Sequence, residues 1–573
     1  MKSERIFKVP EVQNMKEVIY NAVKNYSENI AFVIKHQNGK EVEYENVTYK
    51  RFLEDINKLG TAFYKLGLKG KRVAVIGKNR YEWALAHISN LLGGIVSVPL
   101  DKDLQYDELE RSLIRSKADC IIFDEKLTED ITKIKNAEKT NLKEFICMSE
   151  NKGFSCIPEL LKIGEKELES DSSYVNAEID NDAMAILLFT SGTTAQSKAV
   201  MLSHRNVASN VHDLQSMEDI NSTDTSIALL PFHHIFGSTC MAYTLACGVK
   251  IVFADGLRYV KQNLVEYKVT MFVGVPLLIE SIYKAVVKEI EKQGKTKLIK
   301  IATPITNFLL KIGIDVRRKV YKAVIDGLGG ALRLVIIGGA PADPKILKAF
   351  DDFGITTLQG YGLSETSPVV CAENAKLKKN GTCGHPMPSF EVEIVDKDEQ
   401  GIGEIRAKGP CVMLGYYEMP EQTAEVLKDG WFYTGDLGYF DLDGCLHITG
   451  RNKNMIVLAN GKKVFPEELE TLVSRLDLVE ECMVFGMPSE EDKNDVKLSV
   501  KIVYNKEVAE SKYPGKSEEE LHKILWEQIK EINKSFPRYK YIQNMILTDK
   551  ELIKTTTKKV KRQEEMKIIL NNK

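Results

Sequence analysis

Short runs of apolar residues alternate along the chain with stretches whose apolar positions recur every three or four residues. Arg72–Ile76 and Val96–Leu100 predict strands, and Tyr81–Leu92 between them predicts a helix. A helix near Tyr106–Ser116 and a strand at Cys120–Phe123 continue the pattern. Fully apolar strands separated by helices are typical of sheets that are buried on both faces. This part of the chain therefore predicts an α/β fold, with helices on both faces of largely parallel sheets.

The same alternation returns in the middle of the chain. Val269–Val275 and Leu332–Ile337 predict strands, followed by a helix at Pro344–Phe353 and a strand at Thr356–Leu358. In sheets of this kind, ligands bind in the loops at the carboxyl ends of the strands. We therefore expect the chemistry of this protein in the loops that follow strands.

The last part of the chain has a different pattern. Charged amphipathic helices are mixed with a few separate strands, which predicts a compact α+β unit of about a hundred residues, a common domain size. The predicted elements are a helix at Glu467–Arg475, strands at Glu481–Phe485 and Leu498–Val503, a helix at Ser517–Lys534 and a strand at Ile542–Leu547.

Length and composition narrow the class of protein. A chain of 573 residues exceeds what one core usually supports, so at least two domains are expected. The formal net charge of −2 gives no overall field that would attract nucleic acid, which we do not expect as a partner. Ten cysteines without a C-x-x-C pair suggest reduced thiols in a cytosolic compartment.

The sequence contains no pattern that predicts export or a membrane span. Met1–Lys8 is charged and lacks the apolar segment of a signal peptide. The longest apolar stretches, such as Ala183–Phe189 and Leu91–Leu100, fall short of the roughly 18 residues that a spanning helix needs.

The most informative motif is Phe189-Thr-Ser-Gly-Thr-Thr-Ala-Gln-Ser-Lys198, directly after the apolar strand Met184–Leu188. Such a loop presents backbone N–H groups, hydroxyls and one cation to an anion, which is the chemistry of phosphate binding. It is not a Walker A loop, which would need glycine in place of Ser197 and a hydroxyl residue in place of Ala199. The alternative is a Ser/Thr-rich surface turn.

A second motif is Gln359-Gly-Tyr-Gly-Leu-Ser-Glu-Thr366, again just after a predicted strand. Its glycines let the backbone approach a ligand closely. Tyr361 offers a ring that can stack on a base, and Glu365 is an oxygen donor suited to magnesium. The alternative is a tight turn with a capping Ser/Glu pair.

Two further motifs lie towards the C-terminus. In Trp431–Asp436 an acid follows a glycine turn and can accept both hydroxyls of a ribose, and Ile448–Lys453 supplies an arginine about fifteen residues later. Thr555–Arg562 is strongly basic, and by itself it is typical of a solvated tail.

The order and spacing of these motifs resemble the adenylate-forming superfamily of acyl-CoA synthetases, luciferases and adenylation domains, over nearly the whole chain. The phosphate loop of the family is similar to Phe189–Lys198 with Leu202–Asn206, and its P-x-x-H segment is similar to Pro231–His234. Its adenine and magnesium loops are similar to Gly338–Pro341 and Gly360–Glu365, and its ribose site and hinge are similar to Tyr433–Asp436 and Gly450–Lys453. Its catalytic-lysine segment is similar to Ile553–Arg562.

The chain also departs from the family pattern. Ala195 and Ala199 replace glycines, Ser197 a proline, Ser364 the usual threonine, and Lys558 the glycine before the catalytic lysine. Ala195 puts the freedom of the phosphate loop in doubt, because glycine gives such loops their flexibility. Asn454 occupies the hinge position, where many members carry aspartate. The tract Asn454–Glu468 nevertheless resembles the long-chain fatty acid branch.

This resemblance implies an N-terminal AMP- and acyl-binding domain at residues 1–453 and a mobile C-terminal lid at residues 454–573. It implies a two-step reaction in which Mg²⁺ and ATP activate a carboxylic acid as acyl-AMP, and coenzyme A then accepts the acyl group. The implied residues are Lys559, His234 and Glu365 for catalysis; Thr190, Ser191, Gly192, Thr193, Thr194 and Lys198 for phosphates; Gly339, Ala340, Pro341, Gly360, Tyr361, Gly362, Ser364, Asp436 and Arg451 for the rest of the nucleotide; Glu365 and Thr190 for magnesium; Asn454 for the hinge; Gly461 for the coenzyme A channel; and His234, Phe236 and Gly338 for the acyl pocket.

The acyl group is expected to be a medium- or long-chain fatty acid. Leu298–Ile312 and Arg317–Lys322 are richer in apolar and basic residues than a loop requires, which fits an interfacial segment that meets membranes. The alternative for this stretch is a helical hairpin packed on the core. We expect a cytoplasmic protein with peripheral contact at the inner face of the membrane, as a monomer or a homodimer.

Other functions stay open on the sequence alone. One is a fatty acyl-AMP ligase that passes its product to a carrier protein, although no extra segment stands at the lid junction. A second is an aryl-acid ligase of the same superfamily. A third is a catalytically inactive sensor of nucleotide or acyl chains, which the presence of Glu365, Asp436, Arg451 and Lys559 argues against.

Overall fold

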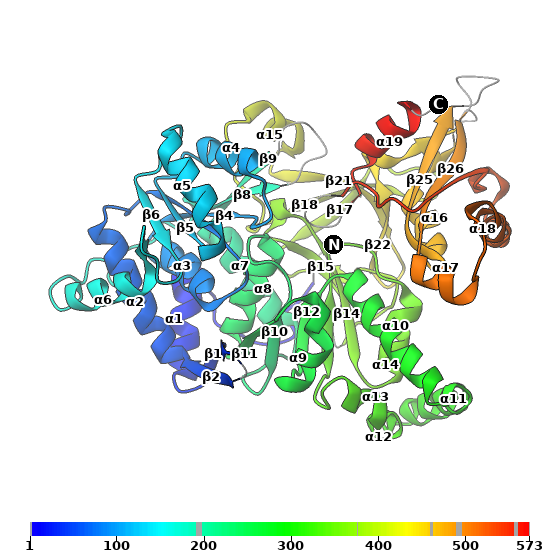
Figure 1. Cartoon of the computed structure of the whole chain (residues 1–573), viewed down its shortest axis with the longest axis horizontal. Helices are drawn as coiled ribbons and strands as arrows, with labels where there is room; N and C mark the ends of the chain where they lie inside the picture. The colour runs from blue at the N-terminus through cyan, green and yellow to red at the C-terminus, as the bar shows by residue number, and fades with distance from the viewer. Residues whose placement is uncertain are drawn as a thin grey trace.

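The computed structural model describes residues 3–39, 41–190, 198–374, 376–458, 462–488, 496–554 and 560–571. Two large, mostly parallel sheets and a smaller antiparallel sheet form the body of the molecule, and the C-terminal elements stand to one side of it (Figure 1). The α/β class predicted from the sequence is confirmed. Among the described residues, none of the helices is both long enough and apolar enough to pass through a membrane.

The first large sheet has eight strands in the order β19-β9-β8-β4-β3-β5-β6-β7, and its strands are parallel from β8 to β7. These strands are β3 (Arg72–Ile76), β4 (Val96–Leu100), β5 (Cys120–Phe123), β6 (Glu144–Cys147), β7 (Ser155–Cys156), β8 (Met184–Thr190), β9 (Lys198–Ser203) and β19 (Gly415–Tyr416).

Helices cover both faces of this sheet, because successive side chains of a strand point to opposite sides. Val73 and Val75 of β3 enter one core, and Ala74 and Ile76 enter another. The helices of this part are α1 (Met15–Tyr26), α2 (Tyr49–Lys65), α3 (Tyr81–Leu92), α4 (Tyr106–Ser116), η1 (Glu125–Leu127), α5 (Thr128–Ala137), α6 (Ile157–Glu167), α7 (His204–Met217) and α8 (Ile235–Ala246).

The second large sheet has nine strands in the order β16-β15-β14-β13-β12-β10-β11-β1-β2, with parallel pairing from β14 to β1. The strands are β1 (Ile30–Asn38), β2 (Glu41–Thr48), β10 (Thr225–Ala228), β11 (Lys250–Phe253), β12 (Met271–Gly274), β13 (Leu334–Ile337), β14 (Thr356–Gly362), β15 (Val369–Ala372) and β16 (His385–Pro386).

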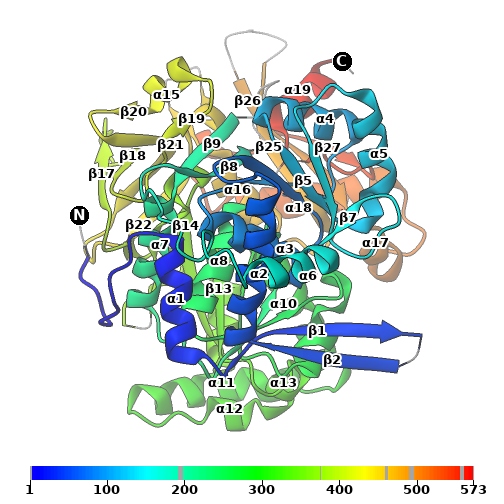
Figure 2. The same ribbon diagram turned by 90° about the vertical axis from the view of Figure 1, so that its left-hand side faces the viewer.

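Helix α8 is buried on nearly all sides because it contributes to the cores of both sheets. Met241 and Leu245 join the core of the first sheet, and Tyr243 packs with Leu334 of β13. On the opposite face of β13, Val335 and Ile337 belong to a separate core that includes residues of the helices labelled α10 and α14 in Figure 1, and Figure 2 shows the same part of the molecule from the side. The remaining helices of this part are η2 (Leu257–Tyr259), α9 (Val260–Glu266), α10 (Pro276–Lys292), α11 (Thr296–Lys311), α12 (Arg317–Val320), α13 (Lys322–Gly327), α14 (Pro344–Asp352) and η3 (Ser364–Thr366).

The third sheet is antiparallel and leads into the C-terminal part. It consists of β17 (Glu391–Val395), β18 (Gly403–Lys408), β20 (Leu427–Lys428), β21 (Trp431–Phe440) and β22 (Leu446–Arg451), with α15 (Pro420–Val426) beside it. The short helix η4 (Asn452–Asn454) follows β22 directly. The exact boundary between the two domains stays a prediction.

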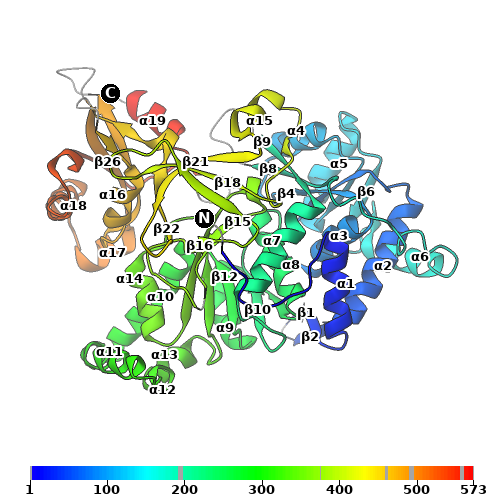
Figure 3. The same cartoon turned by 180° about the vertical axis from the view of Figure 1, so that it is seen from behind.

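The C-terminal part has a core of its own, built between a small sheet and its helices. The predicted α+β unit is therefore confirmed, and Figure 3 shows it from behind. Its elements are β23 (Ile456–Val457), β24 (Lys463–Val464), α16 (Pro466–Val473), β25 (Val479–Pro488), β26 (Val496–Tyr504), α17 (Lys506–Lys512), α18 (Glu518–Asn533), η5 (Arg538–Lys540), β27 (Asn544–Thr548) and α19 (Arg562–Asn571).

Candidate active site

A continuous cleft of about 3000 Å³ runs between the large body and the C-terminal domain. Its floor lies at the carboxyl ends of β12 and β13, where Val275 and Gly338 follow the strands. Residues of the C-terminal domain, among them Phe465 and Arg562, form the opposite wall. The cleft is therefore at the position where open α/β sheets bind ligands.

One group of side chains in the cleft is organised around Asp436. Asp436 of β21 lies opposite Arg451 of β22 in the strand register, and Arg451 Nε forms an ion pair with Asp436 Oδ1 at 2.9 Å. The Tyr361 hydroxyl donates to Asp436 Oδ2 at 2.7 Å. A carboxylate has about four lone-pair sites, so each oxygen can still accept one more hydrogen bond, as two neighbouring hydroxyls would require.

The protonation of Tyr361 suits this arrangement. Burial, reinforced by the Asp436 carboxylate, raises the pKa of Tyr361, so its hydroxyl stays a donor at neutral pH.

The predicted glycine turn before Asp436 is wrong. Gly435 has a φ of 71°, which only glycine adopts easily, yet it lies within the strand Trp431–Phe440, at an irregularity in its pairing with β18.

The second motif also differs from its prediction. Gly360, Tyr361 and Gly362 were expected in a loop, but they form the end of β14 and pair with β15. A Cβ atom at Gly362 would lie 1.9 Å from the carbonyl oxygen of Pro368. The glycine is thus required by close strand packing, and the loop begins only at Leu363.

A second group of side chains surrounds Glu365 in η3. The Tyr416 hydroxyl donates to Glu365 Oε1 at 2.8 Å, and Lys198 Nζ lies 4.3 Å from the centroid of the Tyr416 ring. Thr190 pairs with Lys198 across β8 and β9, and its hydroxyl donates to the Lys198 carbonyl at 3.1 Å. A carboxylate, a hydroxyl and an ammonium group therefore meet at one end of the cleft.

These donors fit a magnesium ion that is held mostly by a substrate. Glu365 Oε2 has no hydrogen-bond partner among the described residues, and the Thr190 oxygen retains a lone pair. Mg²⁺ is usually bound by one or two protein oxygens together with phosphate oxygens and water. In the described part of the chain, no three His, Cys, Asp or Glu residues are clustered as a protein metal cage would require.

Lys453 is a cleft residue that the sequence placed only within a hinge segment. Burial lowers its pKa, and the cations Arg451 and Lys198 act in the same direction, while Asp436 opposes them. The side chain therefore lies within the electrostatic reach of both groups described above.

The predicted hinge residue Asn454 ends η4. Its amide Nδ2 donates to Glu467 Oε1 at 2.8 Å, near the start of α16 in the C-terminal domain.

A further contact between the domains was missed by sequence reasoning. Arg475 binds Asp343, the residue that caps α14, through Nε–Oδ2 at 2.8 Å and Nη2–Oδ1 at 2.9 Å.

The predicted acyl-pocket residues also meet at the cleft. His234 caps the N-terminus of α8, and Phe236 lies in its first turn. A Cβ atom at Gly338 would lie 2.8 Å from Phe236 Cζ, so glycine there lets the ring lie against the end of β13. Apolar side chains from α8 and the second large sheet continue the wall inwards.

The remaining predicted site residues divide into two sets. Gly339, Ala340, Pro341, Gly360, Gly362 and Ser364 line the cleft. Ser191, Gly192, Thr193, Thr194, Gly461 and Lys559 lie outside the described residues. The sequence assigned the Leu202–Asn206 segment to the phosphate loop. In the structure, Ser203 and Asn206 of this segment form a reciprocal cap at the N-terminus of α7.

Comparisons with known proteins agree with the fold and with the cleft. Residues 19–417 match the model of the AMP-binding enzyme family, and residues 453–568 match that of the AMP-binding enzyme C-terminal domain. A chloroplastic long-chain-fatty-acid–[acyl-carrier-protein] ligase of Arabidopsis thaliana is 27% identical over 84% of this chain and 76% of its own length. The long-chain-fatty-acid–CoA ligase 5 of Mus musculus is 30% identical over 77% of this chain and 69% of its own.

Among solved structures, the crystal structure of an anthranilate CoA ligase in complex with anthranoyl-AMP superposes with a TM-score of 0.77. The superposition covers 98% of both chains at 18% identity, so this likeness shows the fold alone.

Proposed function

Because this chain belongs to the AMP-binding enzyme family, we propose that it uses ATP to activate a medium- or long-chain fatty acid as acyl-AMP and transfers the acyl group to coenzyme A. The observation that carries this proposal is that one cleft contains both polar groups, around Asp436 and around Glu365, and an apolar chamber. Phe236, Cys240, Val273, Ile336 and Leu358 line this chamber. The polar groups suit the nucleotide, and the chamber suits the acyl chain.

In the first step, an oxygen of the acid attacks the α-phosphate of ATP, and pyrophosphate leaves. Such chemistry is catalysed mainly by positioning and charge neutralisation. Lys198 and Thr190 would bind phosphates together with Ser191, Gly192, Thr193 and Thr194. Bound by Glu365 and Thr190, Mg²⁺ would neutralise phosphate charge.

The rest of the nucleotide would lie towards β21 and β22. Asp436 would accept hydrogen bonds from the ribose hydroxyls, supported by Arg451, whose side chain is 41% exposed at the cleft. Tyr361 would bound the adenine on one side, and the segment Gly339, Ala340 and Pro341 on the other. Lys559 would reach the junction of carboxylate and phosphate, where negative charge gathers, and His234 would stand beside it at the chamber mouth.

In the second step, the C-terminal lid would rotate about Asn454, remove Lys559 and open a channel past Gly461 for the coenzyme A thiol. The names of the relatives differ in the acceptor, since the plant protein is named for acyl carrier protein and the mouse protein for coenzyme A. Supplying each acceptor to preformed acyl-AMP and measuring thioester formation separates the two.

The fatty-acid assignment predicts a steep dependence of rate on chain length. Each methylene buried in the chamber adds about 0.8 kcal/mol, roughly fourfold in binding. The kcat/KM should therefore rise from butyrate through octanoate towards dodecanoate or beyond, and then level off. A preference for acetate or for a cinnamate-type acid would contradict a fatty-acid substrate while leaving adenylation intact.

Peripheral membrane contact is the second proposal, and it is supported by an exposed apolar stripe on α11. Leu298, Ile301, Ile305, Phe308 and Ile312 recur at helical spacing and are 56–64% exposed. The opposite face of α11 packs on the protein, where Thr306 is 2% exposed. The alternative prediction, a helical hairpin packed on the core, is thus correct only for the buried face of α11. Figure 1 shows α11 projecting from the body.

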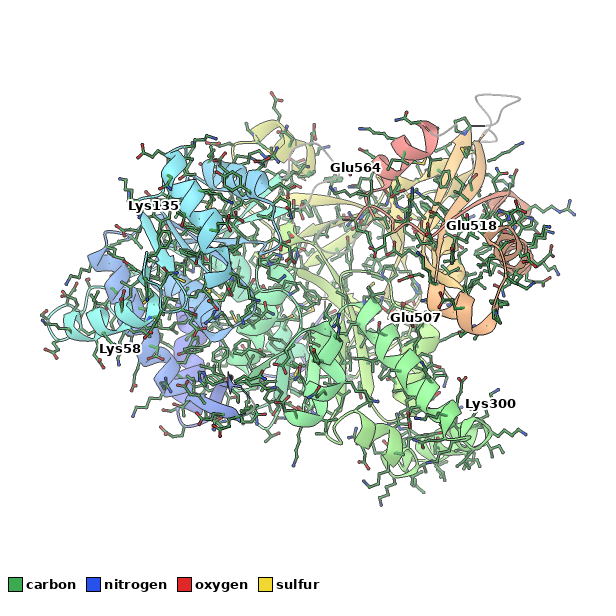
Figure 4. All side chains as sticks on the ribbon, viewed as in Figure 1. Lys58, Lys135, Lys300, Glu507, Glu518 and Glu564 are labelled. Carbon is green, nitrogen blue, oxygen red and sulfur yellow. The ribbon has the colours of Figure 1, made fainter. Side chains whose placement is uncertain are left out.

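Charge on this segment favours an anionic bilayer. Residues 292–314 contain five lysines and no acidic residue, although the chain as a whole has a net charge of −2. Figure 4 shows Lys300 extending outwards from α11. Lysines beside an apolar face can reach lipid headgroups while the apolar side chains enter the interface. This charge supports our proposal of a cytoplasmic protein with peripheral contact at the inner face of the membrane.

This surface predicts that the protein will sediment with vesicles that contain phosphatidylglycerol, and less with phosphatidylcholine alone. The double variant Ile301→Asp/Phe308→Asp should lower the partition coefficient at least about tenfold, because two apolar side chains leave the interface. Leu442→Asp is the matched control, since Leu442 is fully exposed and lies on another part of the surface. Equal binding by the double variant and the control would contradict the proposal.

A further inference from the structure

The lining of the apolar chamber includes two polar side chains. Phe236, Cys240 and Tyr243 lie at spacings of four and three residues on α8, so they occupy one face of the helix and line the cleft in succession. The wall opposite is apolar and is formed by Leu214, Leu230, Val273, Ile336 and Leu358. Beyond Cys240, however, the lining includes the hydroxyl-bearing Tyr243 and the carboxyl-bearing Glu218.

Both polar side chains are buried and have an atom without a partner. Tyr243 is 1% exposed, and its hydroxyl makes no hydrogen bond within the described residues. Glu218 follows the last turn of α7, is 8% exposed, and its Oε1 is likewise without a partner there. Helices α7 and α8 pack against one another (Figures 1 and 3). Burial raises the pKa of Tyr243, and the Glu218 carboxyl acts in the same direction, so the two groups lie within electrostatic reach of each other.

A plain hydrocarbon chain does not explain this arrangement. A buried donor or acceptor without a partner lowers an equilibrium constant by about tenfold to a hundredfold. An alkyl chain in the chamber would leave both the Tyr243 hydroxyl and the Glu218 carboxyl without a hydrogen-bond partner. A hydroxyl group on the chain would satisfy both, because a hydroxyl both donates and accepts hydrogen bonds.

The charge state of Glu218 favours a neutral ligand group. Burial raises its pKa to about 8, with Asp219 and Glu373 acting in the same direction and Arg333 against them. At pH 7 the carboxyl is therefore mostly protonated. A neutral acid beside a phenol suits an alcohol better than an ammonium group.

The place of these groups sets where on the acyl chain the hydroxyl would lie. Tyr243 comes nine residues after His234, which caps the other end of α8 at the mouth of the chamber. At a rise of 1.5 Å per residue, the two residues are separated by about 13 Å along the helix axis. The partner group would thus lie far from the carboxyl carbon, near the end of a medium-length chain.

We propose that the chamber selects fatty acids that carry a hydroxyl group near the distal end of the chain, with Tyr243 and Glu218 as the residues that recognise it. This inference rests on the proposed function, and it adds a substrate class to the same site. It makes Tyr243 and Glu218 determinants of specificity that contact the substrate far from the reacting atoms.

The test compares kcat/KM for AMP formation with dodecanoate, 12-hydroxydodecanoate and 3-hydroxydodecanoate. The wild-type protein should prefer the 12-hydroxy acid over dodecanoate by at least about tenfold, since sites built to bind a hydroxyl reject analogues that lack it. The 3-hydroxy acid should show no such advantage, because its hydroxyl would lie near His234.

Two variants and one control assign the effect to residues. Tyr243→Phe should abolish the preference for the 12-hydroxy acid, and Glu218→Leu should reverse it in favour of dodecanoate. Tyr64→Phe should leave the preference unchanged, because the Tyr64 hydroxyl donates to the Gly93 carbonyl at 2.8 Å, outside the cleft.

The outcomes separate this inference from the proposed function. If dodecanoate reacts as well as the 12-hydroxy acid or better, the inference is overturned, while fatty-acid activation stands. If no fatty acid supports AMP formation, both proposals fail.

Discussion

The Asp436→Ala variant is expected to lose at least about a hundredfold in kcat/KM for ATP. Hydrogen bonds to a charged acceptor contribute about 1.5–3 kcal/mol each, and the proposed site has two of them to the ribose. The substitution also leaves Arg451 Nε and the Tyr361 hydroxyl without their present partner. Most of the loss should appear in KM for ATP, since the ribose takes no part in the reaction.

The nucleotide analogue 2′,3′-dideoxy-ATP makes this test specific for the ribose contact. The wild-type protein should discriminate strongly between ATP and this analogue, and Asp436→Ala should not. Asp443→Ala is a suitable control, because Asp443 lies between the same two strands but outside the cleft. If Asp436→Ala still discriminates as the wild type does, Asp436 has only a structural role.

The Lys559→Ala variant should form acyl-AMP at least about a hundredfold more slowly. Loss of one fixed donor to a charged transition state costs on the order of 3 kcal/mol. Because the lid would carry Lys559 away before the second step, thioester formation from supplied acyl-AMP should stay largely intact. Single-turnover measurements of each half-reaction separate these effects.

Two neighbouring lysines serve as controls for this prediction. Lys558, like Lys559, lies outside the described residues, and Lys561 forms an ion pair with Glu564 at 3.2 Å. A merely basic segment would make all three lysines interchangeable. Equal losses in both half-reactions of Lys559→Ala, or similar losses in all three variants, would refute its catalytic role.

The fold was predictable wherever local pattern and tertiary packing agree. Arg72–Ile76, Tyr81–Leu92 and Val96–Leu100 form the predicted elements with the predicted bounds, because their apolar runs are buried in the cores of the first sheet. The glycine-containing motifs were harder to predict. Glycine usually marks a turn, but Gly360 and Gly362 pair with β15, and Gly435 lies at an irregularity in the pairing of β21 with β18.

The supporting contacts of the site had no local signal in the sequence. Tyr416 reaches Glu365 from 51 positions along the chain, and Arg475 reaches Asp343 from 132 positions. Neither residue belongs to a recognisable motif. Glu218 and Tyr243 belong to none of the motifs identified in the sequence, and only the burial of their polar atoms beside the cleft distinguishes them.

The α11 segment shows why both alternatives for Leu298–Ile312 were reasonable. Its sequence is apolar on two sides, and only the structure reveals that one side is covered and the other exposed. A pattern of hydrophobicity fixes which residues avoid water, but it does not specify whether protein or lipid replaces the water.

The central claim is that the cleft joins a fatty acid to AMP, and exchange of labelled pyrophosphate into ATP tests it most directly. With Mg²⁺ present and coenzyme A absent, we expect exchange that depends on added dodecanoate or its hydroxylated analogue, since only the adenylation step can then run in reverse. Exchange that is absent with every fatty acid, or that proceeds equally without any acid, would contradict the account.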